Sequence, residues 1–179
     1  MLFCVWIVKL SKRRMQKDNP LQGKWPNVVF FLTAFLIVMA DQLSKMWIRA
    51  YLPEGHAVPL TSFLKLTRIH NTGGAFGLFH GQTFPLIIVS IIGAAVLIAY
   101  ALFIYRRFPS IGGVLSKSAL GLILGGTIGN LIDRLYAGYV TDFIDFGFWP
   151  AFNVADSAVV IGVIIFAYSL HSLFETAKD

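Results

Sequence analysis

Residues 84–105 read FPLIIVSIIGAAVLIAYALFIY, an apolar stretch without one charged side chain. A helix of this length crosses the hydrocarbon core of a bilayer, which requires about 20 apolar residues. Three further apolar segments, at 25–47, 114–132 and 154–174, have similar lengths. The sequence therefore predicts an all-α membrane protein built as a bundle of four transmembrane helices.

The composition agrees with a membrane protein. Of the 179 residues, 56% are hydrophobic and only 13% are charged, whereas about 25% is usual for a soluble domain. A single cysteine, Cys4, excludes an intrachain disulfide and a cysteine-rich metal site. The histidines lack the H-E-x-x-H spacing of zinc peptidases, and no G-x-S-x-G or S-x-x-K motif is present. We expect no metal and no other cofactor.

Basic residues are concentrated before the first apolar segment, where six lysines and arginines lie within residues 9–24. A basic tail can bind nucleic acid, but beside a membrane span it more often marks the cytoplasmic side. We therefore expect no nucleic-acid partner. Residues 1–24 are expected to form a basic cytoplasmic extension, with translation starting at Met1 or Met15, and residues 25–176 the membrane domain.

A second basic stretch, with Arg106, Arg107 and Lys117, is expected to form a loop on the same side as the N-terminus. Four spans then leave both termini in the cytoplasm. The connections 48–83 and 133–153 face outward.

The first outer connection contains a strand signal. Residues 64–69, LKLTRI, alternate between apolar and polar side chains, as a half-buried strand does. Asn71 and Thr72 then open a turn with two glycines. We expect a small β-structure between the first two helices, lying on the outer membrane surface with Phe76 and Phe79 toward lipid; an ordinary loop is the alternative.

Carboxylates at membrane depth are unfavourable by several kcal/mol, so each one is a candidate for function. Asp41 lies in the first span, four residues before Lys45. This spacing places both side chains on one helix face. A structural ion pair is the simpler interpretation of Asp41, and direct catalysis is the alternative.

The third span combines small and polar residues. Glycines recur at four-residue intervals, at 121, 125 and 129, which allows a neighbouring helix to approach closely. Asn130, Asp133 and Arg134 follow at the outer end of this helix. We expect them to form a self-satisfied polar network, with Arg134 also able to meet an anionic or carbonyl group of a substrate.

Two more aspartates flank the second outer connection. Asp142 lies in the largely apolar segment 140–146, and burial there would raise its pKa. Asn153 and Asp156 have the spacing of a helix-capping pair, and the helix dipole favours an ionised carboxylate at that position. Capping alone would explain this pair. Two nearby carboxylates that share one proton would instead suit an aspartyl protease.

Five blocks carry a resemblance to a known family: DQLSK at 41–45, NTGGAF at 71–76, GGTIGNLIDR at 125–134, VTDF at 140–143 and FNVAD at 152–156. In this order they resemble the lipoprotein signal peptidase family, also called signal peptidase II. The resemblance implies an aspartyl endopeptidase of the bacterial cytoplasmic (inner) membrane with its active site toward the periplasm. Such an enzyme removes the signal peptide from diacylglyceryl-modified prolipoproteins by cutting before the lipidated lipobox cysteine.

The resemblance also assigns roles to residues. It implies a catalytic dyad of Asp142 and Asp156 that activates water. The residues that line the site or support it are then Asn71, Asn130, Arg134, Asn153, Asp41 and Asp133. The expected partners are the prolipoprotein substrates and membrane lipids, and we expect the protein to be a monomer.

Two other classes of function compete with this interpretation. A small proton-coupled transporter also places carboxylates in the membrane, but it would distribute them along a path across the bilayer. A membrane scaffold could use the glycine face for assembly, but it gives no reason for a cluster of Asn, Asp and Arg at one end.

Overall fold

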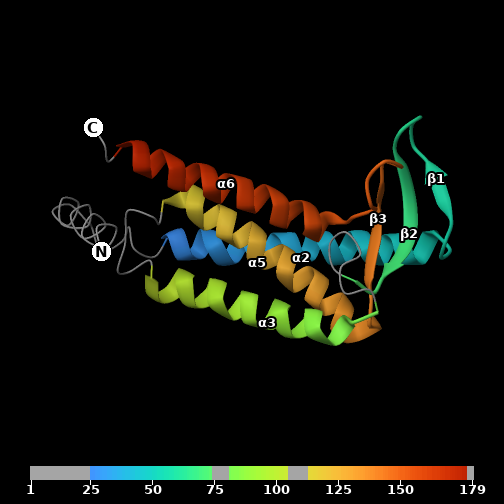
Figure 1. Ribbon diagram of the computed structural model, residues 1–179, viewed down its shortest axis with the longest axis horizontal. Coiled ribbons are helices and arrows are strands. Elements are labelled where there is room, and N and C mark those ends of the chain that lie inside the picture. Colours follow the sequence, from blue (N-terminus) through green and yellow to red (C-terminus); the bar gives the residue numbers. More distant parts are fainter. Residues whose placement is uncertain (1–24, 74–80, 105–112, 177–179) are drawn as a thin grey trace.

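The computed structural model describes residues 25–73, 81–104 and 113–176. Within these ranges the elements that span the length of the molecule are four helices (Figure 1). They are α2 (Trp25–Tyr51), α3 (Thr83–Ala99), α5 (Val114–Ala137) and α6 (Val154–Thr176). All four are long and apolar enough to cross a membrane, which confirms the predicted four-span bundle.

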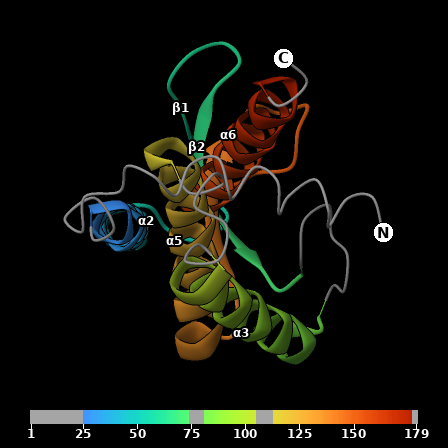
Figure 2. The ribbon, with the colours of Figure 1, turned by 90° about the vertical axis from the view of Figure 1, so that its left-hand side faces the viewer.

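Helix α5 lies between the other three helices, as the view from the end opposite the sheet shows (Figure 2). Its glycines permit this position. A Cβ added at Gly121 or Gly125 would lie 2.7 Å from a backbone oxygen of α2. The expectation that the glycine face brings a second helix close is therefore confirmed. Phe30 and Leu124 are fully buried in the core formed there.

The end of the bundle away from the sheet contains a buried lysine. Helix α3 continues as a π-helix, η2 (Tyr100–Ile104), and Lys117 Nζ donates to the Ala101 carbonyl at 2.8 Å and to Asn27 Oδ1 at 3.0 Å. Lys117 lies within α5 and is 1% exposed. The expectation that it belongs to a surface loop is wrong, because α5 begins at Val114 and turns this side chain inward. Arg106 and Arg107 lie outside the described residues.

A three-stranded antiparallel sheet lies at one end of the bundle (Figure 1). Its order is β1 (Ala57–Pro59), β2 (Lys65–Asn71) and β3 (Val140–Asp145). Strand β2 confirms the strand predicted at 64–69, although a register shift between Leu66 and Ile69 leaves Thr67 buried and Ile69 exposed. Strand β3 was expected only as a connection between helices. Four of its residues are buried in succession, so both faces of the strand are covered. A strand that is covered on both faces does not show the alternating sequence pattern that would have predicted it.

The sheet is fastened to the end of α2. Ile48 and Leu52 pack with Phe143 of β3 in a second apolar cluster. The Arg68 guanidinium of β2 donates to the carbonyls of Arg49, at 3.1 Å, and Leu52, at 3.2 Å. It thereby satisfies backbone acceptors that the helix end leaves without intrahelical partners. Phe76, Phe79 and the extension 1–24 lie outside the described residues.

Candidate active site

Asp142 lies in β3 and is almost completely buried, with 2% of its surface exposed. Asn71 at the end of β2 donates to its Oδ2 at 2.9 Å, because Asn71 pairs with Val140 in the strand register. Asn153 donates to its Oδ1 at 2.7 Å. Both carboxylate oxygens therefore receive a hydrogen bond from a neutral amide.

Burial and the negative charge of Asp156 raise the pKa of Asp142 to about 7. The hydrogen bonds from Asn71 and Asn153 and the positive charge of Lys45 oppose this increase. Removal from water is the largest cause, since it disfavours the charged form. Asp142 can therefore hold a proton near neutral pH, as its apolar segment predicted.

Asp156 lies in the first turn of α6 and forms the predicted capping pair with Asn153. The Asp156 backbone N–H donates to Asn153 Oδ1 at 2.9 Å, and the Asn153 N–H donates to Asp156 Oδ2 at 3.3 Å. Asn130 of α5 donates to Asp156 Oδ1 at 2.8 Å. Helix α5 and the start of α6 thus meet at this carboxylate.

A cavity of about 620 Å³ joins the two aspartates. Its polar lining comprises Asn71, Asn130, Arg134, Asp142, Asp156 and Ser157. The remaining lining is mainly apolar, from the segment 149–152 and from Val159, Val160 and Ile161 of α6. Arg134 donates to the Gly73 carbonyl at 3.2 Å. The cavity can therefore accept a molecule that has both peptide groups and apolar parts.

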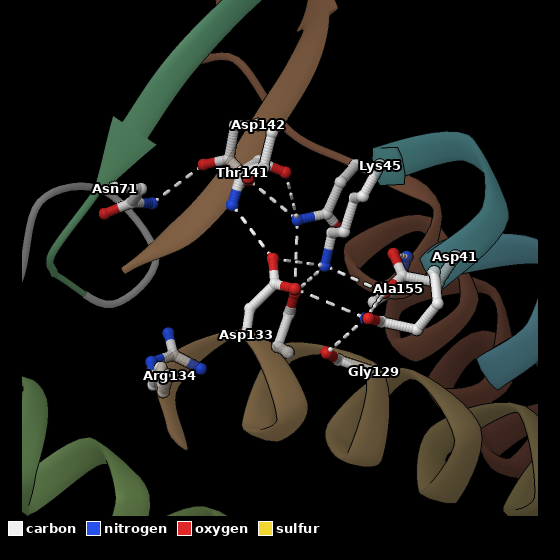
Figure 3. A network of polar contacts seen from close by, with 12 residues as sticks. Asp41, Lys45, Asn71, Gly129, Asp133, Arg134, Thr141, Asp142 and Ala155 are labelled. Atoms are coloured by element: carbon white, nitrogen blue, oxygen red, sulfur yellow. Dashed lines mark hydrogen bonds and ion pairs between the residues drawn. The ribbon is translucent and has the colours of Figure 1, made fainter. Parts of the chain in front are cut away.

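A buried ionic network lies beside Asp142 (Figure 3). Lys45 Nζ lies 2.8 Å from Asp41 Oδ2 and 3.2 Å from Asp133 Oδ2, and none of these side chains is exposed. The predicted Asp41–Lys45 ion pair is confirmed. Arg49 NH2 lies 2.8 Å from Asp133 Oδ1, and Arg49 Nε donates to Thr141 Oγ1 at 2.9 Å.

The predicted self-satisfied network of Asn130, Asp133 and Arg134 is wrong. Asp133 pairs with two cations of α2, whereas Arg134 points to another part of the site (Figure 3). Adjacent helical residues diverge by about 100° around the axis, because a turn takes 3.6 residues. The expectation overlooked that α2 supplies cations to this face of α5.

Arg49 and Thr141 were not predicted as part of this cluster. A signal for Arg49 existed, because Asp41, Lys45 and Arg49 follow one another at four-residue intervals on one helix face. No comparable signal marked Thr141. Within the described ranges, no group of three or more His, Cys, Asp or Glu side chains is arranged to hold a metal ion.

Comparison with known proteins assigns the chain to a family. A family profile described as signal peptidase (SPase) II matches residues 33–172. The chain belongs to the signal peptidase II family. It is therefore a membrane-embedded aspartic peptidase, and the resemblance inferred from its motifs is confirmed.

Individual relatives agree with this assignment. A lipoprotein signal peptidase of Dehalococcoides mccartyi is 47% identical over 137 residues, which cover 76% of this chain and 85% of the relative. Those of Moorella thermoacetica and Francisella tularensis subsp. novicida are 44% and 38% identical, and the matches cover 79% and 86% of this chain and 91% and 97% of the relatives.

Two solved bacterial membrane enzymes share the fold. Their TM-scores are 0.73 and 0.69, at 30% and 32% sequence identity. The matched regions cover 80% and 79% of this chain and 87% and 91% of the solved chains. Most of the described bundle and sheet is therefore common to these enzymes.

Proposed function

We propose that the protein removes the signal peptide from diacylglyceryl-modified prolipoproteins by cutting before the lipidated cysteine, with Asp142 and Asp156 as its catalytic dyad. The observation that carries the proposal is the pair of aspartates in one cavity, with the pKa of Asp142 raised to about 7. At neutral pH the pair can share one proton, which an aspartyl protease requires.

In the proposed reaction Asp142 begins protonated and Asp156 ionised. Asp156 accepts a proton from water as the water oxygen attacks the scissile carbonyl carbon, while Asp142 donates its proton to the carbonyl oxygen. When the tetrahedral intermediate collapses, Asp142 takes that proton back and Asp156 gives its own to the departing nitrogen. The dyad returns to its starting state, and one water has been consumed for one peptide bond.

The polar lining is suited to hold the substrate backbone. Asn71, Asn130 and Asn153 donate to the two carboxylates, which limits how far each can turn. Arg134 is placed to meet a substrate carbonyl, because its guanidinium reaches the cavity and already donates to a neutral carbonyl oxygen at Gly73. Asp41 and Asp133 act behind the dyad as supporting residues.

A membrane location suits this substrate. Each buried CH₂ of a lipid chain holds a modified protein in the bilayer by about 0.8 kcal/mol, so an enzyme within the membrane meets the lipid and the apolar signal peptide where they lie. Val160 and Ile161, at the cavity, are half exposed on the outward side of α6. We propose a monomer in the bacterial cytoplasmic membrane, with both termini in the cytoplasm and the dyad toward the periplasm.

The test is cleavage of a diacylglyceryl-modified prolipoprotein by the purified protein in detergent. We expect Asp142→Asn and Asp156→Asn to fold and to lose at least about 10³-fold in turnover, as for one member of a catalytic unit. Asp145→Asn is the matched control, since Asp145 lies in the same strand, but its carboxylate accepts the Gly147 N–H and does not line the cavity. It should retain activity.

Asp133→Asn distinguishes a supporting role from a catalytic one, and we expect it to keep residual activity. If Asp142→Asn cuts while Asp133→Asn does not, the dyad must be reassigned to Asp133 and Asp156. If the wild-type protein leaves the substrate intact, the proposal fails, and proton transport in vesicles becomes the next assay.

A further inference from the structure

Lys45 occupies a central position behind the two aspartates. Its ammonium group is fully buried and meets three acceptors: Asp41 Oδ2 at 2.8 Å, Asn130 Oδ1 at 2.9 Å and Asp133 Oδ2 at 3.2 Å. A lysine ammonium has three N–H donors and no acceptor. Each donor therefore has one partner, and the three partners come from two helices.

The two carboxylates bound by Lys45 hold the backbone on either side of the dyad. Asp41 Oδ1 accepts the N–H of Ala155 at 3.0 Å, and Asp133 Oδ2 accepts the N–H of Thr141 at 3.0 Å. Ala155 directly precedes Asp156, and Thr141 directly precedes Asp142. Lys45 thus links the carboxylate that holds the start of α6 to the carboxylate that holds β3 (Figure 3).

Asn130 provides a third link, and Lys45 determines its orientation. Because the ammonium can only donate, Asn130 must turn its oxygen toward Lys45 and its NH₂ group away. Asn153 Nδ2 also donates to this oxygen, at 3.1 Å. The Asn130 NH₂ group is then free to donate to Asp156 Oδ1 at 2.8 Å. With the side chain reversed, an oxygen would face the Asp156 carboxylate and the hydrogen bond would be lost.

We propose that Lys45 is a positioning residue for the dyad: it sets the placement of Asp142 relative to Asp156 through Asp133 and Asp41, and it orients the amide of Asn130. This inference rests on the proposed function, since it concerns the geometry of the proposed dyad. Lys45 itself does not line the cavity. It acts on the substrate through the residues that it holds and through its positive charge, which lowers the pKa of Asp142.

A purely structural role makes different predictions. Removing a buried ion-pair partner leaves an uncompensated charge, and this destabilises most proteins by several kcal/mol. That loss would reduce the amount of folded enzyme but not the turnover of each folded molecule. A positioning role predicts folded molecules that bind substrate normally and turn over slowly.

Two variants separate the roles. Lys45→Arg keeps the charge between the two carboxylates, but its planar fork cannot reproduce a single nitrogen that meets three acceptors. The double variant Asp41→Asn with Lys45→Met removes one negative and one positive charge together, so the cluster stays balanced. Lys117→Met is the matched control, because Lys117 is equally buried in the bundle but lies about 24 Å along α5 from residue 133.

Each protein is purified in detergent, its thermal unfolding is measured, and kcat and KM are determined separately with the diacylglyceryl-modified prolipoprotein. We expect both Lys45 variants to fold and to keep KM within about threefold. Their kcat should fall about 100-fold, which a misplacement of about 1 Å can produce. Lys117→Met should keep the kcat of the wild type.

Three results would overturn the inference. The first is a folded Lys45 variant whose kcat lies within threefold of the wild-type value. The second is a loss of kcat in Lys117→Met as large as that in the Lys45 variants. The third is failure of both Lys45 variants to fold, which would show that Lys45 is required for folding and does not only position the dyad. An inactive wild-type protein would instead refute the proposed function, so the two failures are distinguishable.

Discussion

The hydrogen bond from Asn71 to Asp142 allows a quantitative test of the proton assignment. This bond, at 2.9 Å, lowers the pKa of Asp142 against the effect of burial. A hydrogen bond to a charged group contributes about 1.5–3 kcal/mol, and about 1.4 kcal/mol corresponds to one pKa unit. The neutral carboxyl keeps part of the bond, so we take the lower end. Asn71→Ala should therefore raise the pKa from about 7 to about 8.

The proposed mechanism requires protonated Asp142, so kcat/KM should decline as pH rises through this pKa. For the wild type, the ratio of kcat/KM at pH 8 to that at pH 6 should be about 0.1; for Asn71→Ala it should be about 0.5. The ratio within one protein cancels any pH-independent loss that the substitution causes. The assay is cleavage of the lipidated substrate at both pH values in the same detergent.

The control for this prediction is Thr72→Val. Thr72 lies in the same turn and accepts the N–H of Gly81 at 3.3 Å, but it does not line the cavity. Its ratio should match that of the wild type. A ratio for Asn71→Ala that stays at 0.1 or falls below it would refute the assignment of the proton to Asp142.

Three further predictions concern stability. Gly129→Ala places a methyl group 2.6 Å from a buried carboxylate oxygen of α2. The melting temperature of this variant should fall by an amount corresponding to about 1–3 kcal/mol of stability. Gly93→Ala is the control, because its methyl group meets nothing within 4 Å, and it should not be destabilised. Arg68→Ala removes two hydrogen bonds to the end of α2. Amide hydrogen exchange in the sheet should therefore become faster, with a loss of up to about 3 kcal/mol in the free energy of protection. Lys65→Ala, at an exposed position of the same strand, should leave the exchange rates unchanged. Because the pKa of Asp142 is raised, this carboxyl group stabilises the fold fully below pH 3.8, and the contribution is lost as pH rises through about 7. Asp142→Asn should therefore show a smaller decline in melting temperature between pH 5 and pH 8 than the wild type. An unchanged decline would contradict the raised pKa.

The bundle could be predicted from the sequence because a bilayer imposes a simple requirement on length and polarity. Helix ends were less accessible. Helix α5 continues to Ala137, where Gly138 adopts a positive φ of 79°, beyond the predicted end at residue 132. Asn130 and Asp133 near this end are satisfied by contacts with α2, so hydropathy underestimated the length of the helix. Strand β3 was not predicted because its pairing with β2 depends on a distant segment.

The sequence supplied the candidate site residues but only part of their geometry. The motifs singled out Asp142 and Asp156, and burial of the segment 140–146 anticipated the raised pKa of Asp142. Spacing could not place β3 beside the start of α6, because both are held by carboxylates of other helices. The contact of Lys45 with Asp133 likewise joins separate helices. Neighbours along one helix, such as Asp41 and Lys45, were therefore predicted, and neighbours across helices were not.

The buried ionic network has a consequence for how the protein is made. Helix α2 carries Asp41, Lys45 and Arg49, one negative and two positive charges, and the second carboxylate of the cluster, Asp133, belongs to α5. Residue 133 is synthesised 84 residues after residue 49 (133 − 49), or about 4–17 s later at 5–20 residues per second. During that interval α2 has an excess cation that its own sequence cannot neutralise. Helix α2 should therefore be held less firmly in the bilayer before the third span supplies Asp133 than after it.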